Sequence, residues 1–145
     1  MCLYTMSKKV RVAKKDIICY KIVTKERKRG IFWIFHKPIY RALFYINYTY
    51  RLKELNDLGK SLVIVLNSDL ERPYAVNNGF HSFVDIQDAK RMLSEWYDEY
   101  DNQGGPAIVQ CVIPKGAKYI KGTISQYPIS PASYVSNKII CLKEV

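Results

Sequence analysis

Hydrophobic and polar positions along this chain form short alternating or apolar runs, which is the pattern of β-strands. Val, Ile, Tyr and Phe dominate the runs, and charged or turn-forming residues bound them. Such residues fit a pleated, half-buried surface. The pattern therefore predicts strands at residues 17–23, 62–66, 80–84, 107–113, 119–121 and 134–145.

Two further stretches fit the strand pattern less clearly. Residues 31–35 follow the charged turn 24–30 and are placed to return as a hairpin partner of the first strand. Residues 38–52 have apolar positions at helical spacing near their start, whereas 44–52 alternates like a strand. We favour a strand over 44–52, and helix or strand stays open for 38–52 as a whole.

One segment has helical periodicity. Asp85 is a good N-cap residue, because its carboxylate can accept a hydrogen bond from a backbone N–H of the first turn. The apolar residues that follow recur every three or four positions and share one stripe of a helix over about 86–100. They are Ile86, Ala89, Leu93, Trp96, Tyr97 and Tyr100.

These elements predict one domain over residues 1–145. A chain of 145 residues is long enough for one sizeable core and too short for two ordinary ones. With six to seven strands and one main helix, we expect an α+β fold with a largely antiparallel or mixed sheet.

Charge divides the chain into two unequal parts. Residues 1–60 contain 15 Lys and Arg against 4 Asp and Glu, and residues 61–145 contain 8 against 9. The net charge of +10 therefore belongs to the basic N-terminal part, while the C-terminal part is nearly neutral. A one-sided positive field attracts nucleic acid or an acidic protein.

The basic positions cluster in two groups near the N-terminus, with aromatic residues close by in the sequence. If the fold places both groups on one side, they can neutralise several phosphates. Aromatic rings such as Trp33, Phe35, Tyr45 and Tyr48 can stack on bases. The basic patch is predicted to contain Lys8, Lys9, Arg11, Lys14, Lys15, Lys25, Arg27, Lys28 and Arg29.

Four cysteines are spread along the chain as Cys2, Cys19, Cys111 and Cys141. They have no C-x-x-C spacing and no histidine at zinc-ligand distance, so we expect no metal site. Three lie in apolar runs, where a free thiol behaves as a small buried hydrophobe.

The sequence also bears on location. Its longest apolar runs have about five residues, far fewer than the roughly 20 that span a bilayer, and its beginning lacks an apolar signal-peptide core. We expect a cytoplasmic protein with no membrane partner.

Four blocks of the sequence match blocks of a known group of proteins, in the same order along the chain. They are Tyr20-Lys21-Ile22, Gly79-Phe80-His81-Ser82-Phe83, Val112-Ile113-Pro114-Lys115-Gly116 and Tyr134-Val135-Ser136-Asn137-Lys138. With them, the chain resembles a group of small uncharacterised proteins of bacteriophages and gut bacteria. That family has no established activity to transfer, so the resemblance implies an accessory protein of a phage or mobile element.

A more distant resemblance is to the ADP-ribosyltransferase superfamily. It implies a pocket for an NAD-derived nucleotide lined by Tyr20, His81, Ser82, Tyr134 and Asn137. The final block departs from that family, because it has Asn137-Lys138 where the enzymes have a catalytic glutamate. That carboxylate would stabilise the positive charge of the transition state, so its absence argues against transfer chemistry.

His81 has two interpretations. It is either a ligand-contacting group beside Ser82 or a structural residue that satisfies backbone groups where a strand meets a helix. No complete catalytic set can be assembled from the two histidines. We therefore expect a binding module without a cofactor, acting through the basic N-terminal part. The alternatives are a degenerate ADP-ribosyltransferase-like protein and a virion-associated structural protein.

Overall fold

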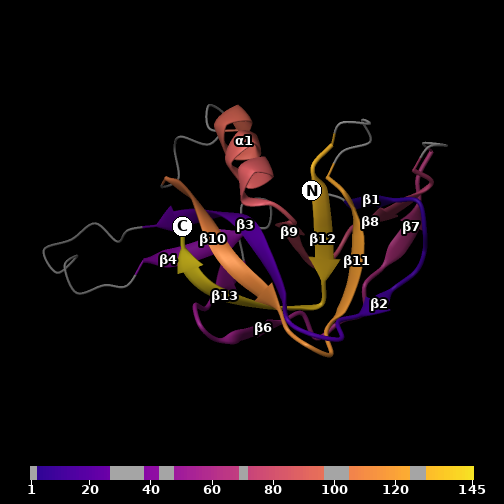
Figure 1. Cartoon of the computed structure of the whole chain (residues 1–145), viewed down its shortest axis with the longest axis horizontal. Helices are drawn as coiled ribbons and strands as arrows, with labels where there is room; N and C mark the ends of the chain where they lie inside the picture. Colours follow the sequence, from indigo (N-terminus) through magenta and orange to yellow (C-terminus); the bar gives the residue numbers. More distant parts are fainter. Residues whose placement is uncertain (1–2, 27–37, 43–47, 69–71, 97–104, 125–129) are drawn as a thin grey trace, which may run out of the picture.

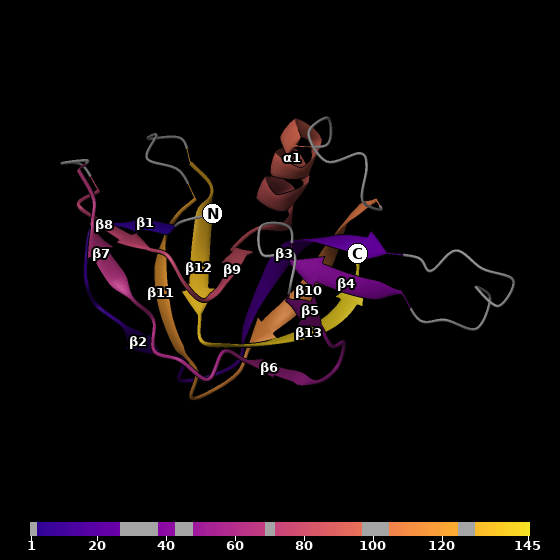
Figure 2. The same cartoon turned by 180° about the vertical axis from the view of Figure 1, so that it is seen from behind.

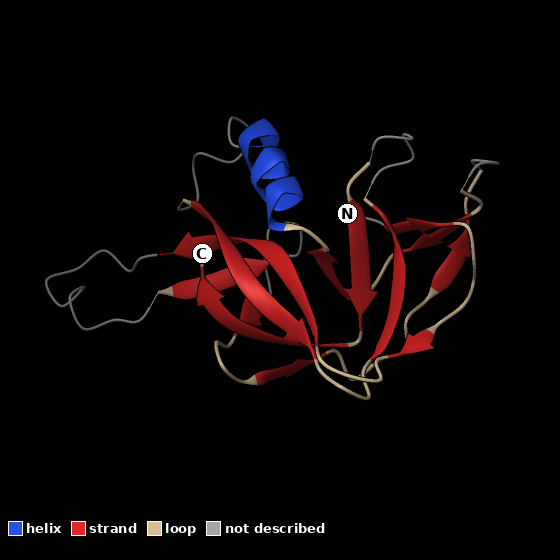
Figure 3. Cartoon of the chain, in the orientation of Figure 1, coloured by secondary structure: helices blue, strands red, loops and turns tan. Residues whose placement is uncertain are grey.

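A computed structural model of the chain describes residues 3–26, 38–42, 48–68, 72–96, 105–124 and 130–145. In these ranges the backbone forms one sheet of 13 strands and a single helix (Figures 1 and 3). In chain order the elements are β1 (Leu3–Thr5), β2 (Arg11–Val12), β3 (Ile17–Glu26), β4 (Ile39–Ala42), β5 (Thr49–Tyr50), β6 (Leu55–Asp57), β7 (Ile64–Leu66), β8 (Tyr74–Val76), β9 (Phe80–Phe83), α1 (Ile86–Trp96), β10 (Pro106–Ile113), β11 (Lys118–Thr123), β12 (Ala132–Ser136) and β13 (Lys138–Glu144).

The protein is mainly β, and the predicted α+β fold with six to seven strands is wrong. The sheet has 13 strands, whereas α1 has 11 residues. Most strands that the sequence did not indicate have only two to four residues, as β2 and β6 do. Such segments are too short to show a period of two, and they become strands because their neighbours supply the hydrogen bonds.

The longer predicted strands are present. They correspond to β3, β7, β9, β10 and β11, while the run 134–145 divides at Asn137 into β12 and β13. The predicted strand at 31–35 and positions 43–47 lie outside the described residues. The described parts of 38–52 contain β4 and β5 and no helical turn.

Asp85 is confirmed as the N-cap of α1. Its carboxylate Oδ1 accepts a hydrogen bond from the Gln87 N–H at 2.6 Å, and its carbonyl accepts one from the Ala89 N–H at 3.2 Å. Two residues of the predicted stripe, Ala89 and Leu93, belong to a cluster that α1 forms with the sheet. Residues 97–100 of the predicted helix lie outside the described ranges.

The sheet follows the order β6-β13-β10-β3-β9-β12-β11-β1-β8-β7, with β2 on β11 and with β4 and β5 extending from β3. All its strand pairs are antiparallel. At its centre β3 pairs with β10 over eight residues, but with β9 through the single pair Tyr20 and Phe83. This narrow junction separates the β3, β10 and β13 side from the β12, β11 and β1 side (Figures 1 and 2).

Alternation along the strands gives the sheet two faces. On β3, Cys19 and Val23 point to one face, where they join Phe80 in the largest buried cluster. We call this the cysteine face. Ile22 points to the opposite face and packs with Phe83 and with Ala89 of α1. We call this the helix face. Side chains one position apart therefore serve different sites.

Candidate functional site

The residues of the predicted nucleotide pocket divide between the two faces. Tyr20 lies opposite Phe83 in the β3 and β9 pair, so its ring is on the helix face, where it packs against the α1 cluster. Tyr134 lies opposite Ser82 in the β12 and β9 pair and packs on the cysteine face. The structure brings Ser82 and Tyr134 together but separates them from Tyr20 by the thickness of the sheet.

His81 is buried, with 8% of its surface exposed, and lies opposite Val135. Burial, followed by the positive charge of Lys21, lowers the pKa of His81 to about 3, although hydrogen bonds with the backbone of Val76 and Gly79 oppose the shift. The imidazole is therefore neutral near pH 7. It is a poor general base there, because a useful base has a pKa near the working pH.

Ser82 and Asn137 occupy different environments. Ser82 is 1% exposed, and its hydroxyl interacts with the Cys19 thiol, which opposes the rise in the pKa of Cys19. The Asn137 side-chain oxygen accepts the Lys118 N–H at 2.8 Å, and the Asn137 carbonyl accepts the Leu58 N–H at 2.9 Å. Asn137 thus holds the turn between β12 and β13, which is a structural role.

The first group of the predicted basic patch lies within residues 8–15, and its members are exposed. They are Lys8, Lys9, Arg11, Lys14 and Lys15. The second predicted group is separated from it by the length of β3, which spans about 30 Å at the usual rise of a strand.

Lys25, at that far end of β3, forms an ion pair with Glu144 at 2.6 Å. The remaining members of the predicted patch, Arg27, Lys28 and Arg29, lie outside the described residues. Of the aromatic residues expected beside them, Tyr48 packs against Tyr50 and Phe80, with ring centroids at 5.0 and 5.2 Å. It therefore belongs to the core.

Basic and aromatic side chains meet where β2 and β12 pair with β11. Arg11 lies opposite Tyr119, and Lys121 lies opposite Tyr134. Tyr119 and Lys121 are two positions apart, so all four side chains share one face. The two tyrosine rings are edge to face with centroids 5.7 Å apart. Burial raises the pKa of Tyr134, and the charge of Arg11 makes a smaller, opposing contribution.

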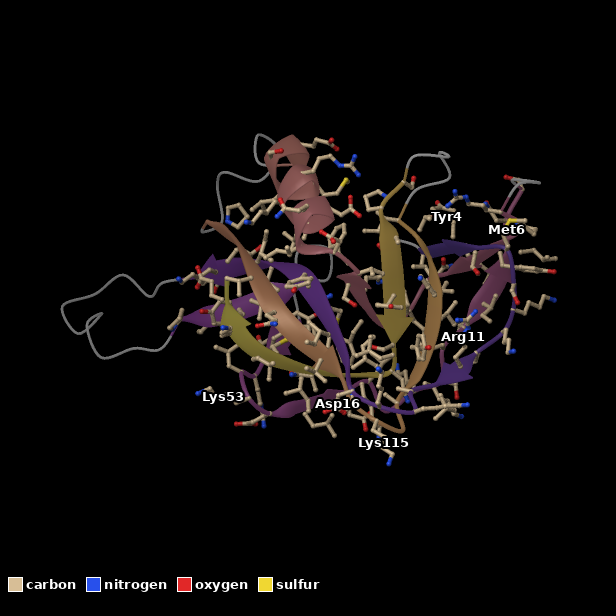
Figure 4. All side chains as sticks on the ribbon, viewed as in Figure 1. Tyr4, Met6, Arg11, Asp16, Lys53 and Lys115 are labelled. Atoms are coloured by element: carbon tan, nitrogen blue, oxygen red, sulfur yellow. The ribbon has the colours of Figure 1, made fainter. Side chains whose placement is uncertain are left out.

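We call Arg11, Tyr119, Lys121 and Tyr134 the tyrosine face. They lie on the same side of the sheet as the cysteine face, against which both tyrosines pack. Both tyrosines are half-buried, while Arg11 and Lys121 are exposed. Figure 4 shows Arg11 beside β2, towards the opposite end of the molecule from Lys53. Tyr119 and Lys121 were not predicted as site residues, because nothing in the sequence shows that β2 and β12 flank β11.

A second feature that sequence reasoning missed is a buried lysine on the cysteine face. Lys21 is 8% exposed, its Nζ donates to the His81 carbonyl at 2.5 Å, and it lies 5.1 Å from the centre of the Tyr50 ring. Burial lowers the pKa of Lys21, and the neighbouring thiols Cys111 and Cys141 oppose this shift. The sequence signal was Cys19-x-Lys21, which puts both side chains on one face of a strand.

The cysteines of the described residues are confirmed as free and buried thiols. Groups of three or more potential metal ligands are absent from the described part of the chain. Among those residues, no helix has the length and apolar character needed to cross a membrane.

Comparison with known proteins gives no relative from which a function can be taken. No family model, no curated protein and no solved structure matches this chain. Its function is therefore inferred from the geometry of the sites above.

Proposed function

We propose that this protein binds single-stranded nucleic acid through the tyrosine face and the neighbouring basic segment 8–15. The observation that carries the proposal is the cross-strand pairing of Arg11 with Tyr119 and of Lys121 with Tyr134. Each pair places a cation beside an aromatic ring. This combination suits a single-stranded nucleic acid, which offers a phosphate and an unstacked base at every nucleotide.

Electrostatics supports the cationic half of this proposal. Segment 8–15 contains five Lys and Arg residues, all exposed, and no carboxylate. On the adjoining β11, Lys118 and Lys121 are also exposed. Cations that replace the counterions of phosphates give an affinity that falls as salt rises.

Tyr119 and Tyr134 support the aromatic half of the proposal. Half-buried rings lose little conformational freedom on binding, because packing against the cysteine face already holds Tyr119 and Tyr134 in place. Their edge-to-face arrangement offers stacking surface without selecting a base, so we expect modest sequence preference. Double-stranded nucleic acid keeps its bases stacked and can use only the cations.

The test is fluorescence anisotropy with labelled single-stranded and duplex oligonucleotides over a series of salt concentrations. Exchanging both cations of the tyrosine face, in Arg11→Glu/Lys121→Glu, is expected to reduce the salt slope of log K by about 1.4, at about 0.7 for each phosphate on a single strand. Tyr119→Leu is expected to weaken binding about 5- to 100-fold with the slope unchanged, because only base stacking is lost.

Matched controls keep the test specific. Lys53→Glu/Lys60→Glu makes the same charge change at two other exposed lysines, and Tyr20→Leu removes a half-buried tyrosine from the helix face. Both are expected to bind like the parent protein. If the parent shows no salt-sensitive binding at low ionic strength, or if the control charge pair weakens it equally, the proposal is wrong.

The hypothesis of an NAD-derived nucleotide pocket has weaker geometric support, because Tyr20 and Tyr134 lie on opposite faces. The resemblance to small phage and gut-bacterial proteins stays a proposal about kinship. It is compatible with an accessory role in nucleic-acid handling, and it adds no activity.

A further inference from the structure

Three buried cysteines form a row across the centre of the sheet. Cys111 on β10 lies opposite Cys19 on β3 and opposite Cys141 on β13. All three are fully buried on the cysteine face. Since they come from distant parts of the chain, the row is a product of strand register.

A β-bulge creates the second half of this row. Gln110 pairs with Lys143 and Cys111 pairs with Cys141, so Leu142 is an extra residue in β13. Without the extra residue, Cys111 would face Leu142 and the Cys141 thiol would point to the other side of the sheet. The bulge therefore aligns the two thiols.

The aligned thiols are in contact. The Cys111 Sγ donates to the Cys141 Sγ at 3.4 Å, in a buried hydrogen bond. Residues directly opposite in an antiparallel pair have Cα atoms about 4.5–5.5 Å apart, within the range that a disulfide bridges. A covalent bond between them needs side-chain rotation rather than strand movement.

The surroundings favour a negative charge on Cys141. The hydrogen bond from Cys111 and the charge of Lys21 both lower the pKa of Cys141, against the effect of burial. The same hydrogen bond raises the pKa of Cys111. Burial instead raises the pKa of Cys19 to about 12. Cys141 is therefore the thiol suited to attack the oxidant, and Cys111 is the thiol suited to react with the oxidised Cys141.

We propose that Cys111 and Cys141 are an oxidisable pair that closes to an intramolecular disulfide with hydrogen peroxide as oxidant. The Cys141 thiolate attacks one peroxide oxygen, the O–O bond breaks, and the other oxygen leaves as water after taking a proton. The Cys141 sulfenic acid is then attacked by the Cys111 sulfur. The S–O bond breaks, its oxygen leaves with the Cys111 proton as a second water, and the two electrons lost by the thiols have reduced the peroxide.

The test uses the full chain treated with hydrogen peroxide. The sample is quenched, denatured with an excess of alkylating reagent, and analysed by intact mass and by mapping of cross-linked peptides. We expect two fewer alkylated thiols than in the reduced protein, and a cross-link between the peptides that contain Cys111 and Cys141. The peptide map needs no variant, so it is informative even where a substitution harms folding.

Cysteine variants distinguish the Cys111–Cys141 pair from the neighbouring Cys19. Cys111→Ala and Cys141→Ala are expected to lose the cross-link, whereas Cys19→Ala, which removes the third thiol of the row, keeps it. Lys21→Met is expected to slow formation of the cross-link severalfold, with the final product unchanged. The inference is overturned if peroxide gives only oxygen adducts, if Cys111 links to Cys19 instead, or if cross-linking persists in Cys141→Ala.

Discussion

Acid is expected to destabilise this protein through His81. The pKa of the buried imidazole is about 3, compared with about 6.5 for an exposed histidine. The unfolded chain therefore binds a proton that the folded chain does not, and stability falls as pH drops from 6.5 towards 3. Linkage with these two values gives a loss of about 2.5 kcal/mol between pH 6 and pH 4 from this one group.

The matched variant is His81→Gln. Glutamine has a similar size, keeps an N–H donor for the backbone groups of Val76 and Gly79, and does not titrate. Urea unfolding followed by circular dichroism at several pH values gives the free energy of unfolding for both proteins. Every other titrating group is shared, so the difference between the two proteins isolates His81.

We expect this difference to change by about 2.5 kcal/mol between pH 6 and pH 4, in the direction that favours His81→Gln in acid. The stability contributed by the neutral imidazole is complete above pH 6.5 and is lost progressively below it. Parallel curves for the two proteins would refute the reasoning, because they would mean that folding leaves the histidine pKa unchanged.

Three further substitutions or treatments test the packing described above. Gly122→Ala would bring a methyl group into the Tyr4 carbonyl of β1 and is expected to cost at least about 2 kcal/mol of unfolding free energy, whereas Gly105→Ala, with open space around it, is a near-neutral control in the same thermal melt. Asp85→Ala removes the N-cap of α1 and is expected to cost about 1 kcal/mol by urea unfolding. Closing the Cys111–Cys141 disulfide encloses about 30 residues and is expected to raise stability by about 3–4 kcal/mol, which reductant reverses; no change in melting temperature would argue against a cross-link in the folded state.

The sequence predicted those elements whose signal is local. Strands such as β3 and β10 have runs of eight or more residues, and the start of α1 depends on the side chain of Asp85. The mainly-β class was missed because strands such as β2 and β6 consist of only two or three residues. Whether such a short segment forms a strand depends on the strand next to it, and a single sequence does not show which segments are neighbours.

The candidate sites depended even more on register. Segment 8–15 could be recognised from composition, but its partner Tyr119 lies more than a hundred positions further along the chain. Tyr20 and His81 were correctly placed in strands, yet grouping them with Tyr134 required knowing which side of the sheet each ring occupies. A shift of one residue reverses that side, so sequence order alone leaves such a pocket undetermined.

Lys21 connects the acid sensitivity due to His81 with the oxidation of Cys141. Its charge lowers the pKa of His81 and also lowers that of Cys141, so one buried amine acts on groups from both faces of the sheet. Lys21→Met should therefore raise the pKa of His81, which makes the acid-induced loss of stability smaller, and should slow oxidation of Cys141. Lys25→Met removes a lysine four positions along β3 that pairs with Glu144 instead and should do neither. If Lys21→Met changed only one of the two properties, a shared electrostatic origin would be wrong.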